Sequence, residues 1–238
     1  SGFQKNVLYF HGCYVNYNNH ELGTKMVKVV NALGYGVQVT KEKCCGVPLI
    51  ANGYIEKAKK NAAFNIKSLS KTSSDMKIIS TSSSCTYALK HEYPGFLKLD
   101  NSAFNERTFY ITKFIFEEFM SGNIPAMKNL SIRAAYHSPC HLERTGGVIY
   151  TLNVLKMIPG LDLVVLNSEC CGIAGTYGFK NENYQISQDV GKNLFNMINS
   201  VHPEFVITDC ETCKMQIEMN TEFKVLHPVE VLEMTLKE

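Results

Sequence analysis

The sequence lacks a surplus of charge of either sign, and it lacks long basic or apolar runs. Its 238 residues carry a formal net charge of +2, with 45% hydrophobic and 19% charged residues, as in an ordinary globular protein. Because no basic run is present to neutralise phosphates, we expect no nucleic-acid partner. No apolar stretch approaches the roughly 20 residues of a membrane-spanning helix. Any membrane contact is therefore expected to be peripheral.

Cysteine is the residue that the sequence has in excess. There are nine cysteines, an odd number that cannot all pair as disulfides within one chain. Two adjacent pairs, Cys44-Cys45 and Cys170-Cys171, each precede a glycine, and adjacent cysteines are poor disulfide partners for each other. Clustered thiols in a cytosolic chain more often indicate metal or redox chemistry than structural disulfides.

The cysteines follow an internal repeat. In each half, a cysteine that ends an apolar segment is followed by Cys-Cys-Gly after 30 or 29 residues, and by another cysteine after a further 39 or 38. Three spaced features that agree in order and distance indicate two halves built on one plan. The positions are Cys13, Cys44-Cys45 and Cys85 in the first half, and Cys140, Cys170-Cys171 and Cys210 in the second.

Short apolar runs alternate with helical stretches in both halves. The runs "VLYF", "GVQVT" and "KIIST", and later "IRAAY", "DLVVLN" and "FVITD", predict buried strands. Residues 22–34 and 150–160 predict equivalent helices. Strands alternating with helices predict an α/β fold: two Rossmann-like halves with mostly parallel sheets, related by a pseudo-twofold axis. The Gly and Pro residues in 119–129 place the boundary there, giving halves 1–122 and 123–238.

This fold places every cysteine at, or just after, the carboxyl end of a strand, where ligands of open α/β sheets collect. Five thiols of the second half should converge there, one more than a tetrahedral zinc accepts. They favour an iron–sulfur cluster, in which several irons share the thiolates. Zinc remains the alternative metal, and buried reduced cysteines are the alternative without metal. The five are Cys140, Cys170, Cys171, Cys210 and Cys213.

The first half has four matching cysteines and Ser82 where the second half has Cys210. Its sequence therefore allows a second, altered cluster, a zinc site, or no metal. A serine oxygen is an uncommon iron ligand. The four cysteines are Cys13, Cys44, Cys45 and Cys85.

Other residues near these thiols predict supporting roles. His137 and His141 flank Cys140 and are expected to hydrogen-bond sulfur, bind metal or relay protons, although His141 could simply cap the following helix. Gly172 lets backbone N–H groups approach the cluster's inorganic sulfides. Asp209 and Glu211, which flank Cys210, either tune the reduction potential of the bound cluster or are simply solvated.

The segment 108–120, "TFYITKFIFEEFM", is apolar around much of its circumference. It predicts a helix that is either buried or in contact with a membrane surface or partner subunit.

These motifs resemble the CCG domain, a cysteine-rich family found in the B subunit of heterodisulfide reductase and in iron–sulfur subunits of glycolate and lactate oxidation. The stretches "FHGCYVNYNN", "KEKCCGVPLIANGY", "CCGIAGTYGFKNENY" and "TDCETCKMQIEM" look most like the C-terminal region of the C subunit of anaerobic glycerol-3-phosphate dehydrogenase. The resemblance covers nearly the full chain. That subunit carries a ferredoxin-like domain with CxxCxxCxxxCP motifs, which this sequence lacks, so a C-terminal fragment or a shortened protein is expected.

The resemblance implies that the five-cysteine set of the second half holds a non-cubane 4Fe-4S cluster. It implies an electron-transfer subunit that passes electrons from catalytic flavin subunits to membrane quinone, peripherally on the cytoplasmic face of the inner membrane. No residue is then catalytic in the bond-making sense. Two alternatives remain: a disulfide- or quinone-reducing enzyme of the heterodisulfide reductase type, and a zinc-stabilised docking module.

Overall fold

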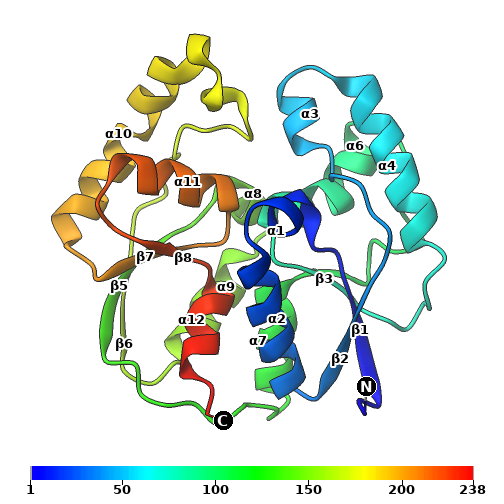
Figure 1. The fold of residues 1–238 in the computed structure, drawn as a ribbon, viewed down its shortest axis with the longest axis horizontal. Coiled ribbons are helices and arrows are strands. Elements are labelled where there is room, and N and C mark those ends of the chain that lie inside the picture. The colour runs from blue at the N-terminus through cyan, green and yellow to red at the C-terminus, as the bar shows by residue number, and fades with distance from the viewer. Residues whose placement is uncertain (1, 238) are drawn as a thin grey trace.

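Residues 2–237 are described by a computed structural model, and they form two four-stranded sheets in which every pairing is parallel (Figure 1). The sheets have the same strand order, β2-β1-β3-β4 and β6-β5-β7-β8, so the predicted two-half α/β fold is confirmed. The strands are β1 Lys5–Tyr9, β2 Tyr35–Val39, β3 Ile78–Ser80, β4 Thr108–Tyr110, β5 Ile132–His137, β6 Leu161–Val165, β7 Phe205–Thr208 and β8 Val225–Leu226.

Helices connect successive strands in both halves, as parallel pairing requires. Those of the first half are α1 Gly12–Tyr17, α2 His20–Ala32, α3 Val47–Ala51, α4 Ile55–Leu69, α5 Ser83–Tyr87, the π-turn Ala88–Glu92, α6 Tyr93–Gly95 and α7 Ile111–Met120. Those of the second are α8 Cys140–Arg144, α9 Val148–Lys156, the 3-10 turns Tyr177–Phe179 and Asn181–Asn183, α10 Tyr184–Val201, α11 Glu211–Asn220 and α12 Pro228–Thr235.

Helix α2 shows how the local sequence sets an element. The side chain of Asn19 accepts a hydrogen bond from the Leu22 N–H and caps the first turn. Leu22, Met26 and Val29 then recur on one face and are buried. The helix ends at Ala32, and Gly34 adopts a positive φ of 83°, which suits the chain reversal into β2.

All six predicted strands are present, but β4 and β8 were not predicted. The segment 108–120 was expected to be one helix; its first three residues instead pair with β3, and α7 starts directly at Ile111. No glycine or proline separates the two elements, so nothing in the local sequence signals the change. Strand β8 has only two residues. The rest of the predicted helix is buried at Phe114, Ile115 and Phe119, which confirms the buried interpretation.

The two halves meet through four helices that lie between the sheets (Figure 1). Helix α2 packs against α12, and α7 packs against α9, so each half contributes one helix to each pair. A single apolar core runs through this interface and includes Val29 and Ile115 of the first half with Leu155 and Leu232 of the second. The halves therefore share their central core.

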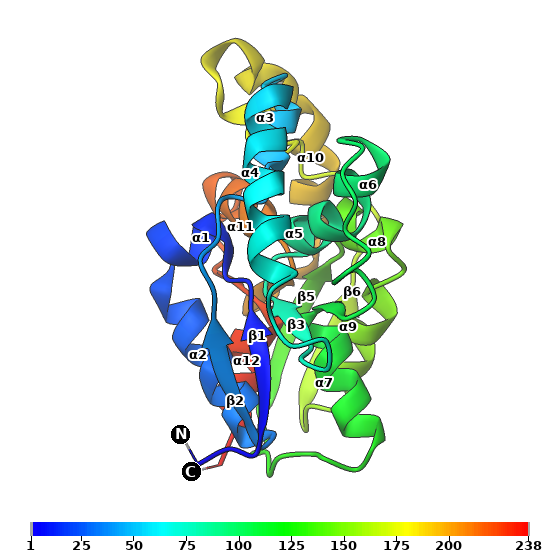
Figure 2. The same ribbon diagram turned by 90° about the vertical axis from the view of Figure 1, so that its right-hand side faces the viewer.

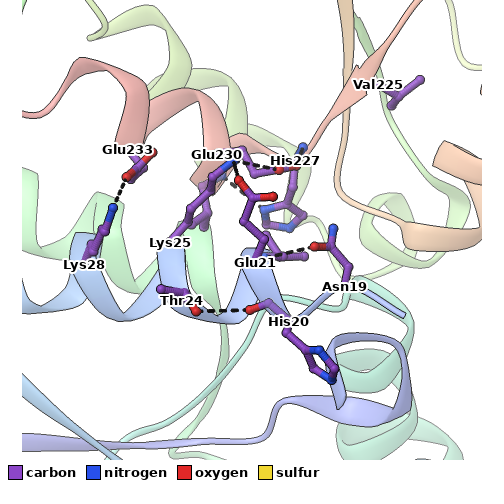
Figure 3. Close-up of polar contacts among 12 residues, drawn as sticks. Asn19, His20, Glu21, Thr24, Lys25, Lys28, Val225, His227, Glu230 and Glu233 are labelled. Atoms are coloured by element: carbon purple, nitrogen blue, oxygen red, sulfur yellow. Dashed lines mark hydrogen bonds and ion pairs between the residues drawn. The ribbon is translucent and has the colours of Figure 1, made fainter. Parts of the chain in front are cut away.

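Ion pairs border the contact between α2 and α12 (Figure 3). The Lys28 ammonium lies 2.9 Å from Glu233, and the Lys25 ammonium lies 3.4 Å from Glu230 and 2.8 Å from Glu21. Partly exposed pairs of this kind contribute about 0–1 kcal/mol each. The apolar core therefore holds the helices together, and the charges border it.

Helices α3, α4 and α10 lie at one extremity of the molecule, and α2, α7 and α12 run toward the other (Figure 2). Within residues 2–237, no helix is both long enough and apolar enough to span a membrane.

Candidate metal centre

Each cysteine follows a strand at its carboxyl end, as the sequence predicted. Cys13 and Cys140 lie in the first turn of the short helices after β1 and β5. The two Cys-Cys-Gly segments form the loops after β2 and β6. Cys85 and Cys213 lie in the first turns of α5 and α11, which follow β3 and β7. The shared strand order therefore brings three cysteine-bearing turns to one sheet edge in each half.

All five thiols of the second half line one cavity of about 350 Å³, which we call the second cavity. Cys171, Cys210 and Cys213 are buried, whereas Cys140 and Cys170 are exposed at its rim. The closest sulfurs are those of Cys171 and Cys213, which lie 3.2 Å apart. The structure thus gathers this predicted set around one space, with an open side toward solvent.

The thiols of this cavity differ in their proton affinity. Hydrogen bonds from Cys170 and then Cys213 hold the pKa of the Cys171 thiol far below its usual range. The pKa values of Cys170 and Cys213 are raised, first because each shares a hydrogen bond with the Cys171 sulfur. A hydrogen bond with Cys213 lowers the pKa of Cys210 to about 7. Cys171 is therefore ready to act as a thiolate ligand, which is the form that binds metal.

The donor set fits a group larger than one ion. Tetrahedral zinc with Zn–S bonds of about 2.3 Å would draw four sulfurs to about 3.8 Å from one another. Among residues 2–237, no three His, Cys, Asp or Glu side chains gather closely enough to hold a single metal ion. Five thiols around a cavity instead match the wider span of an iron–sulfur cluster.

His137 lies near Cys171, although it does not line the second cavity. Its side chain is buried, and neither ring nitrogen has a hydrogen-bond partner within the described part of the chain. Burial lowers the pKa of this imidazole, so the ring is neutral. A buried ring with two unmatched nitrogens costs free energy unless a partner is supplied. A cluster bound by the neighbouring Cys171 would provide acceptor sulfides for its N–H.

His141 faces the second cavity from α8 and contacts the first half. Its Nδ1 lies 2.9 Å from Ser84 Oγ, and its ring stacks on Tyr87 with centroids 4.8 Å apart. Ser84 Oγ also lies 3.9 Å from Cys210 Sγ. Nothing in the sequence singles out Ser84, because its place beside the other half's thiols arises only from the tertiary fold.

Gly172 has a packing role as well as the predicted one. Its N–H donates to the Cys170 sulfur at 3.4 Å, in line with the expected backbone approach. However, its φ is +87°, and a Cβ there would lie 2.0 Å from the Ser187 carbonyl oxygen of α10. Any side chain would therefore push the Cys-Cys-Gly loop away from α10.

The first half has a smaller cavity of about 260 Å³, the first cavity, lined by Cys13, Cys45 and Cys85. Cys44 borders a neighbouring cavity together with Cys13, and their sulfurs are 3.7 Å apart. A hydrogen bond from Cys13 lowers the pKa of Cys44 well below the usual thiol range. Glu42, which the sequence did not single out, accepts the Gly12 N–H at 2.6 Å beside this pair.

Ser82 occupies the position that the repeat assigned to it. It is the N-cap of α5, as Cys210 is the N-cap of α11. Its hydroxyl accepts the Cys85 N–H at 3.1 Å and donates to the Glu211 carboxylate of the second half, also at 3.1 Å. Glu211 lines the first cavity and is buried. The alternative that Glu211 is simply solvated is therefore wrong.

Asp209 is also buried, and it lies in a hydrogen-bond network between the halves. Its carboxylate accepts from Tyr136 at 2.5 Å, and from Thr151 and Tyr110 at 2.8 Å. Burial raises the pKa of Asp209 to about 6, against the opposing effect of these bonds. His227 lies 2.9 Å from Tyr110 and extends the network across the interface. This network holds the turn that carries Cys210.

The two cavities share part of their lining, namely Val47, Ser84, Gly175 and Thr212. Gly175 of the second half approaches α3 of the first, where a Cβ would lie 3.2 Å from Ala51. The two cysteine sites are therefore neighbours at the junction of the halves.

A family model described as a cysteine-rich domain, CCG, matches residues 7–90 and 134–218. The chain is 47% identical over 237 residues to the C subunit of anaerobic glycerol-3-phosphate dehydrogenase of Escherichia coli K12, covering 98% of this chain and 60% of that protein. It is 29% identical to the B subunit of the fumarate reductase (CoM/CoB) of Methanothermobacter marburgensis, over 95% of this chain and 45% of that protein.

A third relative is lactate utilization protein A of Geobacillus sp. WCH70, 29% identical over 94% of this chain and 97% of that protein. The chain thus spans about 60% or less of the first two relatives and nearly all of the third. Each of the two family matches lies within one half of the fold and contains one set of clustered cysteines.

Proposed function

The chain belongs to the family of CCG cysteine-rich domains, and from that premise we propose that it is an iron–sulfur electron-transfer unit of an anaerobic glycerol-3-phosphate dehydrogenase. The observation that carries the proposal is the cavity lined by Cys140, Cys170, Cys171, Cys210 and Cys213. The 47% identity to the C subunit of that dehydrogenase supports the choice of complex.

In this proposal the five thiols of the second half ligate a non-cubane 4Fe-4S cluster, and the cysteines of the first half hold a second cluster of altered type. A bound cluster supplies reversible one-electron chemistry. The chain's own groups fix its surroundings: Cys171 is preset as a thiolate, His137 offers a buried ring nitrogen, and Gly172 contributes close backbone packing. Such surrounding hydrogen bonds and burial set the reduction potential.

The partners in this proposal are catalytic flavin subunits, which oxidise glycerol 3-phosphate, and membrane quinone, which accepts the electrons. The protein would sit peripherally on the cytoplasmic face of the inner membrane. The two adjacent cavities support passage of electrons through the chain, because both open at the junction of the halves and share Ser84 and Thr212 in their lining.

The test is anaerobic purification followed by iron, sulfide and zinc analysis and EPR. We expect a brown protein with iron and acid-labile sulfide. Cys171→Ser should remove the signal of the second half, and the equivalent Cys45→Ser should remove that of the first. Each variant serves as the control for the other. Colourless protein that contains only zinc would contradict the proposal and favour the docking module.

A second candidate function is a disulfide- or quinone-reducing enzyme. The shared lining of the two cavities favours it, because a substrate between them would contact both sites. The departure at Ser82 disfavours it, since the first half lacks the fifth thiol. Turnover of a disulfide by the anaerobic protein without partner subunits would reverse this ranking.

A further inference from the structure

The first cavity combines thiols of its own half with a carboxylate of the other. Glu211, the first residue of α11, lines this cavity together with Cys13, Cys45 and Cys85. The residue is only 7% exposed. Its Oε2 accepts the Ser82 hydroxyl, while its Oε1 is buried and has no hydrogen-bond partner within the described part of the chain.

Ser82 is not free to act as the missing ligand. Its oxygen accepts the Cys85 N–H as the helix cap, and its proton is donated to Glu211. Binding metal would require the hydroxyl to give up that proton, and with it the bond that holds Glu211. The hydroxyl instead fixes one carboxylate oxygen of Glu211, and the other oxygen is buried and has no partner within the described residues. Ser82 therefore acts as a positioning residue for Glu211.

The second half offers a comparison within the same molecule. Its cavity already has five thiols, and Cys210 stands at the position equivalent to Ser82. The first-half position equivalent to Glu211 is Ser83, which lines neither cavity. The second cavity also has a carboxylate residue of the opposite half in its lining, Glu92, but that side chain is only half-buried. Of these two residues, only Glu211 is buried with an oxygen that lacks a partner within the described residues.

We propose that Glu211 supplies a carboxylate oxygen as a ligand to an iron–sulfur cluster in the first cavity, in the place that Cys210 fills in the second. The inference rests on the proposed iron–sulfur function. A buried carboxylate oxygen without a donor carries a large desolvation cost. An iron ion offsets that cost, and carboxylate oxygen is an established ligand of protein-bound iron. Cys210 and Glu211 then serve different clusters from adjacent positions.

The test isolates the first site with Cys171→Ser and Cys213→Ser together, which remove two thiols of the second. In this background we expect iron and labile sulfide to remain at about half the wild-type content. Adding Glu211→Gln should speed iron release to a chelator on the order of tenfold and should change the EPR signal. Glu222→Gln removes an exposed carboxylate just after the same helix and should change neither.

The metal-free protein distinguishes a ligand from a purely structural residue. If Glu211 is a ligand, its buried carboxylate has no cation in the metal-free protein, so Glu211→Gln should leave the unfolding midpoint unchanged or raise it. If Glu211 is purely structural, the same substitution should lower that midpoint. Ser82→Cys, added to Glu211→Gln, should restore iron retention by supplying the fifth thiol. If Glu211→Gln does not fold, Ser82→Cys alone decides: the new thiolate should replace Glu211 and alter the first-site EPR signal, and an unaltered signal overturns the proposal.

The outcomes separate this inference from the proposed function. Unchanged iron release after Glu211→Gln overturns the ligand assignment. A double cysteine variant without iron, beside wild-type protein with iron, overturns it as well and leaves the second-half cluster standing. Wild-type protein that holds no iron under anaerobic conditions contradicts both.

Discussion

Two equivalent residues, at the carboxyl ends of β1 and β5, differ in chemistry close to the turns that carry the cysteines. His137 follows Tyr136 at the end of β5, and Phe10 follows Tyr9 in the first half. Phe10 is fully buried, and His137 is 1% exposed. A phenyl ring therefore fits this position in one half, while the other half accepts an imidazole without hydrogen-bond partners inside the described chain. This difference is expected if the imidazole of His137 donates a hydrogen bond to a bound cluster and the phenyl ring of Phe10 does not.

Exchanging these two residues tests that interpretation. His137→Phe should leave the metal-free protein at least as stable, because it removes two unmatched buried nitrogens. It should also shift the EPR signal or potential of the second-site cluster. Phe10→His is the reciprocal control and should cost about 1–3 kcal/mol of unfolding free energy, because it creates an unmatched buried ring. Urea unfolding of both metal-free variants measures this. A large loss of stability in His137→Phe would show that the imidazole has a structural role.

The repeated spacing predicted that the cysteines and Ser82 follow the carboxyl ends of strands, and the structure places them there. Their role as ligands stays a prediction. The sequence could not decide whether the side chains of Asp209 and Glu211 are buried or exposed to solvent. Both follow a buried strand and precede an exposed-looking helix, so their local pattern allows solvation. Their burial depends on Tyr110 and Ser82, which come from the other half. Contacts of this kind, with more than 90 residues between the partners, leave no periodic trace in the chain.

At the scale of single elements, the start of α12 depends on one buried histidine. The Val229 N–H donates to His227 Nδ1 at 3.1 Å, so Nδ1 carries no proton. Nε2 therefore carries it and donates to the Thr81 carbonyl at 2.8 Å. The Glu230 carboxylate accepts the His227 N–H and completes the cap (Figure 3). Burial lowers the pKa of His227 to about 3.

This cap should make the stability of the protein depend on pH. Below its ordinary pKa of about 6.5, His227 binds a proton in the unfolded chain but not in the folded one. Its contribution is complete above that value and is lost as pH falls toward about 3. From pH 7.5 to 5.5 the loss is about 1.4 kcal/mol. Urea unfolding of the metal-free protein measures it.

His227→Asn keeps a capping side chain without a titrating group. The variant should be less stable at pH 7.5, because it loses the bond to Thr81, but its stability should fall less between pH 7.5 and 5.5. Asp209 titrates in both proteins, so the difference between them reports His227. If the free energy of unfolding fell equally with pH in the wild-type protein and in His227→Asn, His227 would be protonated in the folded protein.

The contact between α2 and α12 separates apolar from charged contributions. Lys28 is 61% exposed on its side chain and pairs with Glu233, whereas Val29 beside it is fully buried. Lys28→Met should cost less than about 1 kcal/mol, and the cost should shrink in high salt. Val29→Ala should cost about 1–3 kcal/mol at any salt concentration. A double-mutant cycle with Glu233→Gln isolates the pair; a salt-independent coupling above that range would contradict the assignment.

Elements with a clear period were predicted and the shortest were not. Helix α2 shows a buried stripe and a cap, and each of the six predicted strands is an apolar run between turn signals. Strand β4 has three residues and runs straight into α7, so its apolar residues read as the first turn of that helix. Strand β8 is defined by its pairing with β7 rather than by its two residues.

At the scale of the whole molecule, the two halves complete each other. The core at their junction contains residues of α2 and α7 from one half, and of α9 and α12 from the other. Ser84 reaches the second cavity, and Glu211 reaches the first. We propose the division at residues 122 and 123, where the chain passes from α7 toward β5, as the boundary of two repeats that fold together.

Expressing the halves separately tests this interdependence. Residues 1–122 and 123–238 alone should lack a cooperative unfolding transition, because each exposes the apolar faces of two helices. Mixed or co-expressed, they should associate and recover the circular dichroism spectrum and iron content of the intact chain. Two halves that each unfold cooperatively at the midpoint of the intact protein would show independent domains.

The pair Tyr110 and His227 bears on how such a molecule arose. Phe109 and Leu226 hold matching positions in the two sheets, so the residues that follow them are counterparts, and these two counterparts are in contact. In a homodimer ancestor, one gene would have encoded both positions, and each residue there would have faced its own copy. A tyrosine opposite a histidine requires two separately inherited codons. Under that descent, the present pair would date from after duplication and fusion, when the two cavities would also have become free to diverge.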